Sequence, residues 1–321
     1  MTSETMPSMI VIKDLTKRYG QLTAVDRITL TVEEGEIFGF VGPNGAGKTS
    51  TLRMIACLLE PSSGEIQVGG HSITTDSRAV RRLIGYMPDF FGVYNDMKVW
   101  EYLDFFGACY AIPEIERAQL IDDLLELVDL KHRQEDMVDK LSRGMKQRLS
   151  LARTLVHDPQ VLILDEPASG LDPRARVEIR ELLVELAKMG KTIFFSTHIL
   201  SDVAEICTRV GIIEAGKLVA VGALEDLQQQ IMPRRLIELT VLGHMEEAQS
   251  LLETIPGVVN VDKFQNNGGR SRLRIEFSGD DAAVSAALAI LVQNGIPVLH
   301  FNESRRDLEE VFMRATKGLV T

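Results

Sequence analysis

The eight residues Gly42–Thr49, GPNGAGKT, constrain the fold of this chain more than any other segment. They match the pattern G-x-x-x-x-G-K-[ST] in full. They stand between a strand-like apolar run, Glu36–Val41, and a helical pattern that continues to about Leu59. In that context the backbone N–H groups of the turn and of the helix start point at phosphate oxygens. The segment therefore predicts a phosphate-binding loop in an α/β fold.

Each part of this loop has an expected role. Lys48 brings a point charge to the β- and γ-phosphates, and the Thr49 hydroxyl is expected to bind Mg²⁺. The cofactors predicted from the loop are ATP and Mg²⁺. The residues expected to bind the nucleotide here are Gly42, Pro43, Asn44, Gly45, Ala46, Gly47, Lys48, Thr49 and Ser50.

Two later segments place acid and base groups at strand ends. VLILDE, Val161–Glu166, ends in two carboxylates after a run typical of a buried parallel strand, and ligands bind at such ends in open sheets. We expect Asp165 to hold Mg²⁺ and Glu166 to activate the attacking water. His198 ends TIFFSTH and is expected to hydrogen-bond the γ-phosphate. Taken alone, such acids are usually turn or helix-cap residues and such a histidine is structural. The upstream loop favours the catalytic roles.

The length and the order of elements predict two domains. Strands alternate with helices up to residue 224, with a mostly helical part at about 97–157, so we expect an α/β domain with a helical insertion over 1–224. Residues 225–321 predict a small α+β domain in the ferredoxin-like order β-α-β-β-α-β, followed by a last helix. The expected elements of that domain are Leu236–Val241, Glu246–Ile255, Val258–Phe264, Arg272–Phe277, Asp281–Asn294, Pro297–Phe301 and Asp307–Thr316.

Charge and composition exclude several classes of protein. The net charge is −11 and both domains are acidic, which disfavours binding to a nucleic-acid backbone. The three cysteines are far apart, so neither a disulfide framework nor a zinc site is expected. No secretory signal is expected at the N-terminus. The longest apolar run, Ala282–Val292, is far shorter than a membrane span.

In this order the motifs resemble those of the nucleotide-binding subunit of an ABC transporter, over about residues 9–222. The resemblance implies a head-to-tail dimer that sandwiches two ATP molecules, works with separate integral membrane permease subunits, and is peripheral at the cytoplasmic face of the cell membrane. Tyr19 falls where the family stacks an aromatic ring on adenine; the alternative is a tyrosine that merely ends a strand. Asp172, in the SGLD segment Ser169–Asp172, falls in a loop that communicates across the dimer; the alternative is a plain turn.

The chain departs from the family pattern in two places. The signature segment Leu141–Met145 is LSRGM instead of L-S-G-G-Q, but it keeps Ser142 and Gly144, which the resemblance directs to the γ-phosphate of the opposite subunit. Asp89 stands where the family has a glutamine that faces Mg²⁺ and the lytic water, so we include Asp89 among the metal-binding and catalytic residues. The aromatic loop that follows it would meet a membrane subunit or, alternatively, cap the helical insertion; its residues are Phe90, Phe91, Val93 and Tyr94.

The C-terminal part resembles the accessory domain on ATPase subunits of some bacterial exporters, including drug and antibiotic pumps. It could support the dimer, bind a regulatory ligand or stabilise the subunit, and we favour dimer support.

The expected function of the chain is ATP hydrolysis that powers transport, in the export direction. The alternative is a soluble ABC-type ATPase that acts on a nucleic acid or the ribosome. A single phosphate-binding loop, the absence of long heptad runs and the acidic charge disfavour it.

Overall fold

The computed structural model describes residues 7–90, 92, 96–231, 234–267 and 270–303. They form two compact units that divide between Leu224 and Glu225. Within these residues no helix is long and apolar enough to cross a membrane. The predicted helix Asp307–Thr316 lies outside the described residues, so the structure does not bear on it.

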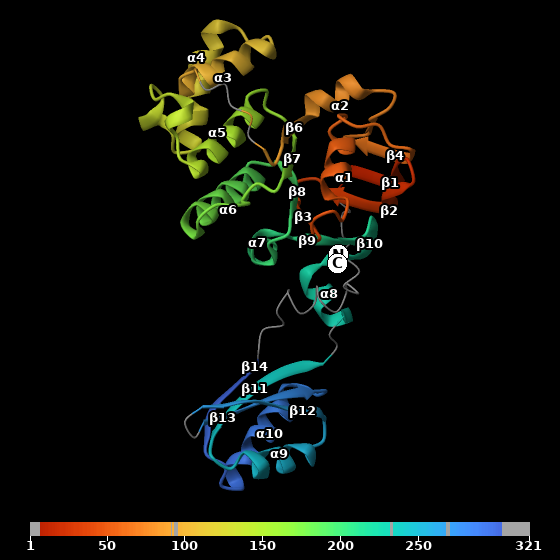
Figure 1. Ribbon diagram of the computed structural model, residues 1–321, viewed down its shortest axis with the longest axis vertical. Helices are drawn as coiled ribbons and strands as arrows, with labels where there is room; N and C mark the ends of the chain where they lie inside the picture. The colour runs from red at the N-terminus through yellow and green to blue at the C-terminus, as the bar shows by residue number, and fades with distance from the viewer. Residues whose placement is uncertain (1–6, 91, 93–95, 232–233, 268–269, 304–321) are drawn as a thin grey trace. The chain divides into compact units, whose positions relative to one another are not determined.

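The first unit is built on a six-stranded sheet with the strand order β10-β9-β3-β8-β7-β6 (Figure 1). Its neighbours are parallel except for the edge strand β10, which is antiparallel to β9. Every residue of β3, β7 and β8 is buried, which confirms the buried parallel strands predicted at 161–164 and 192–196. The strands are β3 Ile37–Val41, β6 Ile84–Met87, β7 Val161–Asp165, β8 Thr192–Thr197, β9 Arg209–Glu214 and β10 Lys217–Ala223.

A second, antiparallel sheet with the order β2-β1-β4-β5 shares one hydrophobic core with β3, β7, β8 and helix α1. Its strands are β1 Ser8–Tyr19, β2 Leu22–Glu33, β4 Ser63–Val68 and β5 His71–Ser72. The apolar patterns at 9–12 and 28–32 predict only the first part of β1 and the last part of β2. Register shifts interrupt the alternation in the rest of both strands, so no period-2 pattern was visible there.

The helices of the first unit cover the large sheet and form a lobe next to β6. Helix α1 ends at Ile55, earlier than the predicted end near Leu59, because Cys57 takes a left-handed φ of 55°. Helices α3, α4 and α5 stand together in the part of the chain expected to be helical (Figure 1). The helices are α1 Lys48–Ile55, α2 Ser77–Leu83, α3 Val99–Cys109, α4 Glu114–Leu127, α5 Arg143–Leu155, α6 Pro173–Lys188 and α7 Leu200–Ile206, with 3-10 turns η1 Lys131–Arg133 and η2 Val138–Lys140.

The second unit is a small antiparallel sheet with two helices against it. The strand order is β12-β13-β11-β14. Ile237, Leu239 and Val241 alternate along β11 into a core that also contains Leu252 of α9 and Leu291 of α10. The elements are α8 Leu224–Ile231, β11 Arg235–Leu242, α9 Met245–Glu253, β12 Val258–Asn267, β13 Arg270–Phe277, α10 Asp281–Gln293 and β14 Val298–Glu303.

Candidate active site

The glycine-rich turn joins β3 to the N-terminus of α1, as the sequence predicts. Gly45 and Gly47 have φ values of 80° and 106°, which an L-residue adopts only with strain. A Cβ on Gly47 would also lie 2.4 Å from the carbonyl oxygen of Ala24, and one on Gly42 would lie 2.3 Å from that of Ile213. These close approaches hold the turn so that the first-turn N–H groups of α1, which have no intrahelical acceptor, face the cleft.

Lys48 is buried at the base of this turn. Its Nζ donates to the carbonyl oxygens of Gly42, at 2.7 Å, and Pro43, at 3.2 Å. It also lies 3.2 Å from Oε1 of Glu166, with both side chains at most 10% exposed. The three donors of the ammonium group are thus matched by three protein oxygens.

The ends of β7 and β8 bring the two acids together with a hydroxyl and an imidazole. Ser196 Oγ donates to Asp165 Oδ1 at 2.6 Å, and Thr49 Oγ1 donates to the same oxygen at 3.2 Å. Oε2 of Glu166 lies 2.8 Å from Nδ1 of His198. Glu166 therefore bridges Lys48 and His198, and Asp165 joins Thr49 to β8.

Glu166 itself has an unusual backbone. Its φ is 51°, in the left-handed region that non-glycine residues rarely adopt. Its N–H reaches both the carbonyl oxygen and the hydroxyl of Ser196, each at 3.1 Å, which fixes the turn at the end of β7. The sequence did not single out Ser196, because a serine inside an apolar strand carries no signal of its own.

These residues line a cleft of about 320 Å³. Of the predicted site residues, the structure brings Asp89, Glu166 and His198 to this cleft together with the turn. Asp165 contacts the lining residue Thr49 but does not itself line the cleft, and neither do Gly42, Ala46, Tyr19, Ser142, Gly144 and Asp172. The lining consists of Ala24, Pro43, Asn44, Gly45, Gly47, Lys48, Thr49, Ser50, Asp89, Glu166, Ser169 and His198.

Asp89 reaches the cleft from the end of β6. It follows Pro88, is exposed, and has no hydrogen bond or ion pair to its carboxylate among the described residues. Phe90, next in the chain, is 82% exposed. The other aromatic-loop residues of the sequence prediction, Phe91, Val93 and Tyr94, lie outside the described residues.

The signature segment contacts the loop after Glu166, in which Ser169 lines the cleft. Ser142 caps α5 by accepting from the N–H of Met145 at 3.3 Å. Arg143 donates to the carbonyl oxygen of Ser169 at 3.2 Å, and the buried amide of Gln147 donates to that of Pro167 at 2.8 Å. The sequence missed both contacts, since they join segments that are 20 or more residues apart.

The remaining two predicted residues lie at the ends of elements and are exposed: Asp172 precedes α6, and Tyr19 is the last residue of β1. Asp172 caps α6, with Oδ1 accepting from the N–H groups of Arg174 and Ala175 at 3.0 Å each. Tyr19 ends β1 with 47% of its surface exposed, and the ammonium group of Lys17 lies 5.3 Å from its ring centroid.

The donor set of the cleft suits a hard cation. Thr49, Asp165 and Asp89 offer oxygen ligands, whereas no thiol lines the cleft among the described residues. That part of the chain also holds no cluster of three or more His, Cys, Asp or Glu side chains arranged for a metal. A cation bound here would need further oxygens from water or phosphate. Mg²⁺ binds in this way.

Comparisons with known proteins agree on one family. Residues 25–169 match the family described as ABC transporter, and residues 222–316 match the C-terminal domain of DrrA1-3-like ATP-binding proteins. The bacitracin transport ATP-binding protein BcrA of Bacillus licheniformis is 36% identical over 98% of this chain and 99% of its own length. The linearmycin resistance ATP-binding protein LnrL of Bacillus subtilis is 32% identical over 96% and 98%.

Solved structures show the same likeness over about two thirds of the chain. An ATP-binding subunit of an ABC transporter aligns with a TM-score of 0.63 and 30% identity, over 70% of this chain and 93% of its own. A dimeric ATP-binding cassette bound to ADP and phosphate, in a post-hydrolysis state, aligns with a TM-score of 0.62 and 26% identity. That alignment covers 67% of this chain and 99% of the cassette.

Proposed function

This chain belongs to the ATP-binding proteins of ABC transporters and is an ABC transporter ATPase with a DrrA1-3-like C-terminal domain, and we propose that ATP hydrolysis in its cleft drives export through separate membrane subunits. Bacitracin transport and linearmycin resistance, in the names of two relatives that match nearly the whole chain, support the direction of export. The observation that carries the proposal is the Glu166 carboxylate, held at the cleft between Lys48 and His198.

In our proposal, Lys48 and the first-turn N–H groups of α1 bind the β- and γ-phosphates of ATP. All three donors of Lys48 have protein acceptors, so a phosphate oxygen must replace one of them. Two of these acceptors are backbone carbonyls fixed by the turn. The third is the Glu166 side chain, which can rotate away. Arrival of the substrate thereby releases Oε1 of Glu166 from its ion pair.

Glu166 then acts as the general base. Its Oε1 accepts a proton from the water whose oxygen forms the new bond to the γ-phosphorus, while the bond from that phosphorus to the bridging oxygen of ADP breaks. Oε2 remains with His198, which orients the carboxylate and would hydrogen-bond the γ-phosphate. The contact with His198 holds the carboxylate before substrate arrives, so only its ion pair with Lys48 has to break.

Thr49 and Asp165 would hold Mg²⁺, with Asp89, which also lines the cleft, as a further oxygen ligand. The ion, when bound, offsets negative charge on the phosphate oxygens. Ser196 holds Asp165 in place through its 2.6 Å hydrogen bond, so the metal-binding carboxylate is oriented by β8.

A second copy of the chain completes the site in this proposal. Ser142 accepts a hydrogen bond from its own helix, which leaves its O–H to donate to a phosphate of the opposite copy. Gly144 would offer a backbone approach beside it, Asp172 would lie at the contact between copies, and the exposed ring of Tyr19 would stack on adenine. The likeness to a dimeric cassette bound to ADP and phosphate supports this arrangement.

We also propose the domain division 1–224 and 225–321, with a helical subdomain at about 97–157. The strand order β12-β13-β11-β14 and the sequence of elements from β11 to β14 support a ferredoxin-like topology for the C-terminal domain. Its role would be to support the dimer. The protein would work as a peripheral subunit at the cytoplasmic face of the cell membrane, bound to its permease partners.

Replacing the base tests this proposal. Glu166→Gln keeps the shape of the side chain but cannot accept the proton, so phosphate release from Mg²⁺-ATP should fall at least about 100-fold. Equilibrium binding of ATP should be retained, because the phosphate donors are unchanged. Glu181→Gln, on the exposed side of α6, is the matched control and should leave turnover unchanged. Turnover within about threefold of the original protein would overturn the role of Glu166.

A further inference from the structure

Arg143, the first residue of α5, places a cation where a helix least favours one. The unpaired N–H groups at a helix start give that end a partial positive charge, so basic side chains are stabilising at the opposite end. Arg143 also stands where the family pattern L-S-G-G-Q has a glycine. Among the described residues no carboxylate lies within ion-pair distance of its guanidinium. The contact that offsets its unfavourable position is instead with the backbone of the turn after Glu166.

Two side chains of α5 donate hydrogen bonds to this turn. Arg143 donates through Nη2 to the carbonyl oxygen of Ser169 at 3.2 Å, and Gln147 donates to that of Pro167 at 2.8 Å. Residues four apart lie on one face of a helix, so both bonds come from the same side of α5. The N–H of Ser169 donates to the carbonyl oxygen of Glu166 at 3.1 Å, which closes the turn. The turn that begins at the proposed base is thus held to α5 by two of its carbonyl groups.

Gly170 leaves room for the guanidinium. A Cβ at this position would lie 2.6 Å from Nη1 of Arg143 and closer still to Cζ, so any larger residue would displace the guanidinium. Gly170 also has a φ of 66°, which glycine adopts without strain. The contact between Arg143 and Ser169 therefore depends on a bare backbone at the next residue.

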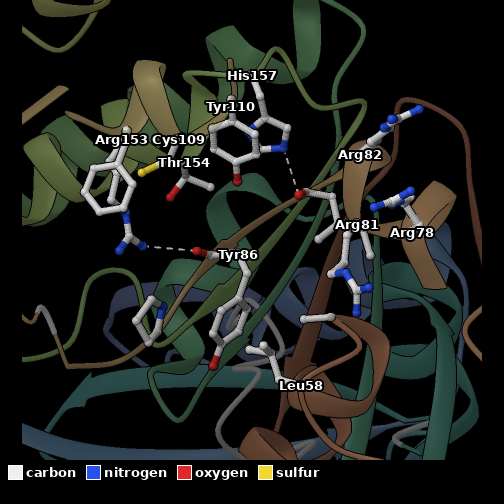
Figure 2. Close-up of a pocket in the computed structure, with 14 residues that line it drawn as sticks. Leu58, Arg78, Arg81, Arg82, Tyr86, Cys109, Tyr110, Arg153, Thr154 and His157 are labelled. Carbon is white, nitrogen blue, oxygen red and sulfur yellow. Dashed lines mark hydrogen bonds between the residues drawn. The ribbon is translucent and has the colours of Figure 1, made fainter. Parts of the chain in front are cut away.

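The other end of α5 is fixed to β6. Arg153, in the last turn of α5, donates to the carbonyl oxygen of Tyr86 at 3.1 Å, and its guanidinium lies 5.3 Å from the ring centroid of Phe106. Figure 2 shows the contact with Tyr86 in the wall of a cavity of about 650 Å³ between α2, β6, α3 and α5. Because both ends of α5 are anchored, the helix is a firm support from which Arg143 reaches the turn.

We infer that Arg143 is a positioning residue for the Glu166 carboxylate. It holds the turn through the carbonyl group of Ser169, and the turn sets the direction in which Glu166 faces the cleft. This inference rests on the proposed function and adds to it a residue that acts through another. A hydrogen bond from a charged donor is stronger than one between two neutral groups, so a single bond can hold the turn. Glycine at position 143 could not make this contact, so the support belongs to this chain and not to the family pattern.

Substitution of Arg143 tests the inference in the purified full-length protein. Arg143→Met keeps the unbranched stem and removes the donors, so kcat for Mg²⁺-ATP hydrolysis should fall at least about fivefold. KM and equilibrium ATP binding should change less than about twofold, because the phosphate-binding turn is untouched. Arg143→Lys restores a charged donor and should return kcat to within about twofold of the original.

Lys146→Met is the matched control. Lys146 lies in the same helix and donates to the carbonyl oxygen of Asp139 at 3.1 Å, outside the turn after Glu166. The same change of side chain at this position should leave kcat unchanged. Urea unfolding followed by the fluorescence of Trp100 checks that each variant is folded.

Removal of the base separates positioning from a merely structural role. In Glu166→Gln there is no carboxylate to position, so the further change Arg143→Met should lower the single-turnover rate less than about twofold. A structural role would lower it by the same factor whether or not Glu166 is present. Glu166→Gln with near-original turnover would overturn the proposed function together with this inference. Equal factors in the two backgrounds would overturn the role of Arg143 alone.

Gly170→Ala approaches the same contact from its other side. The new Cβ displaces the guanidinium, so kcat should fall at least about threefold more in the original protein than in Arg143→Met, where the contact is already lost. The left-handed φ strains alanine in both backgrounds and cancels from the comparison. This comparison needs no stable Arg143→Met in the ATP-free state if Arg143→Lys serves as the second background, in which the loss should be as large as in the original protein.

Two further results would overturn the inference. One is a kcat of Arg143→Met within about twofold of the original protein. The other is a loss of the same size in Lys146→Met, which would show that any change at the start of α5 has this effect.

Discussion

At the scale of single residues, the backbone of Glu166 explains how the proposed base is held. A left-handed non-glycine residue costs about 1–3 kcal/mol, and the two contacts from Ser196 to its N–H hold it in that conformation. The backbone leaves the direction of β7 at Glu166. The Glu166 side chain therefore contacts Lys48 and His198. Strain of this kind at the end of a central strand is a feature of preorganised sites.

Asp89 gives a prediction at the same scale. Because its carboxylate lines the cleft but contacts no turn residue, Asp89→Ala should lower ATP turnover by more than it weakens ATP binding. Asp89→Gln restores an oxygen donor without the negative charge and should recover part of the turnover. Phosphate release and equilibrium ATP binding are measured for both variants, with exposed Asp96→Ala as the control. A large loss of ATP affinity with unchanged turnover would contradict the proposed role.

The sequence predicted the site residues that belong to motifs with fixed spacing. Lys48, Asp165 and His198 each lie at the end of a strand or the start of a helix, so the order of parallel strands was enough to bring them together. Ser196 and Gln147 could not be found in this way. Their contacts depend on how two distant segments pack, and neither residue type stands out in an apolar strand or an amphipathic helix.

At the scale of elements, the half-buried imidazole of His157 connects β6 to the segment after α5. His157, just beyond the end of α5, stacks on Tyr110 at the end of α3 and contacts the first residue of β6. Burial lowers the pKa of His157 from its usual value of 6.5, and the contact with Ile84 opposes that shift only in part.

Helix α2 and strand β6 were the hardest elements to predict from the sequence. Helix α2 has a single buried residue, Val80, and β6 has only four residues, too few to show a period.

The lowered pKa predicts a pH dependence of stability. The unfolded imidazole binds a proton near pH 6.5 while the folded one stays neutral to lower pH, so stability is full above 6.5 and is lost as pH falls below it. Urea unfolding, followed by the fluorescence of Trp100 in α3, should show this loss between pH 7.5 and 5.5. His157→Gln, which can still donate to Ile84, should show a smaller loss over that range. Identical slopes for the two proteins would contradict this account.

At the scale of the whole molecule, the chain has separate hydrophobic cores in its two units. The alternating patterns of 236–241 and 272–277 predicted the C-terminal strands well, because each has one face on its own core and one away from it. A mutation in one core should therefore lower the stability of its own unit and leave the stability of the other unit unchanged.

Leu291→Ala tests this separation. Removing a fully buried leucine side chain should destabilise the C-terminal unit by about 2–5 kcal/mol. Amide hydrogen exchange in β11 and β13 should rise accordingly, while the unfolding transition reported by Trp100 and the ATP turnover should not change. Leu299→Ala, at a position that is 44% exposed, is the control and should have a much smaller effect. An equal shift of the Trp100 transition would show that the two cores unfold together.

The end of β6 places covalent neighbours in different cavities: Pro88 lines the cavity between α2, β6, α3 and α5, and Asp89 lines the ATP cleft. A ligand in the first cavity that moves Pro88 also moves the Asp89 carboxylate, so binding in the two cavities would be linked through one peptide bond. Such linkage is reciprocal. A partner that tightens ATP binding tenfold must itself be held tenfold more tightly by the ATP-bound protein, a coupling of about 1.4 kcal/mol in either direction. The affinity of this chain for its partner would then change at every turnover.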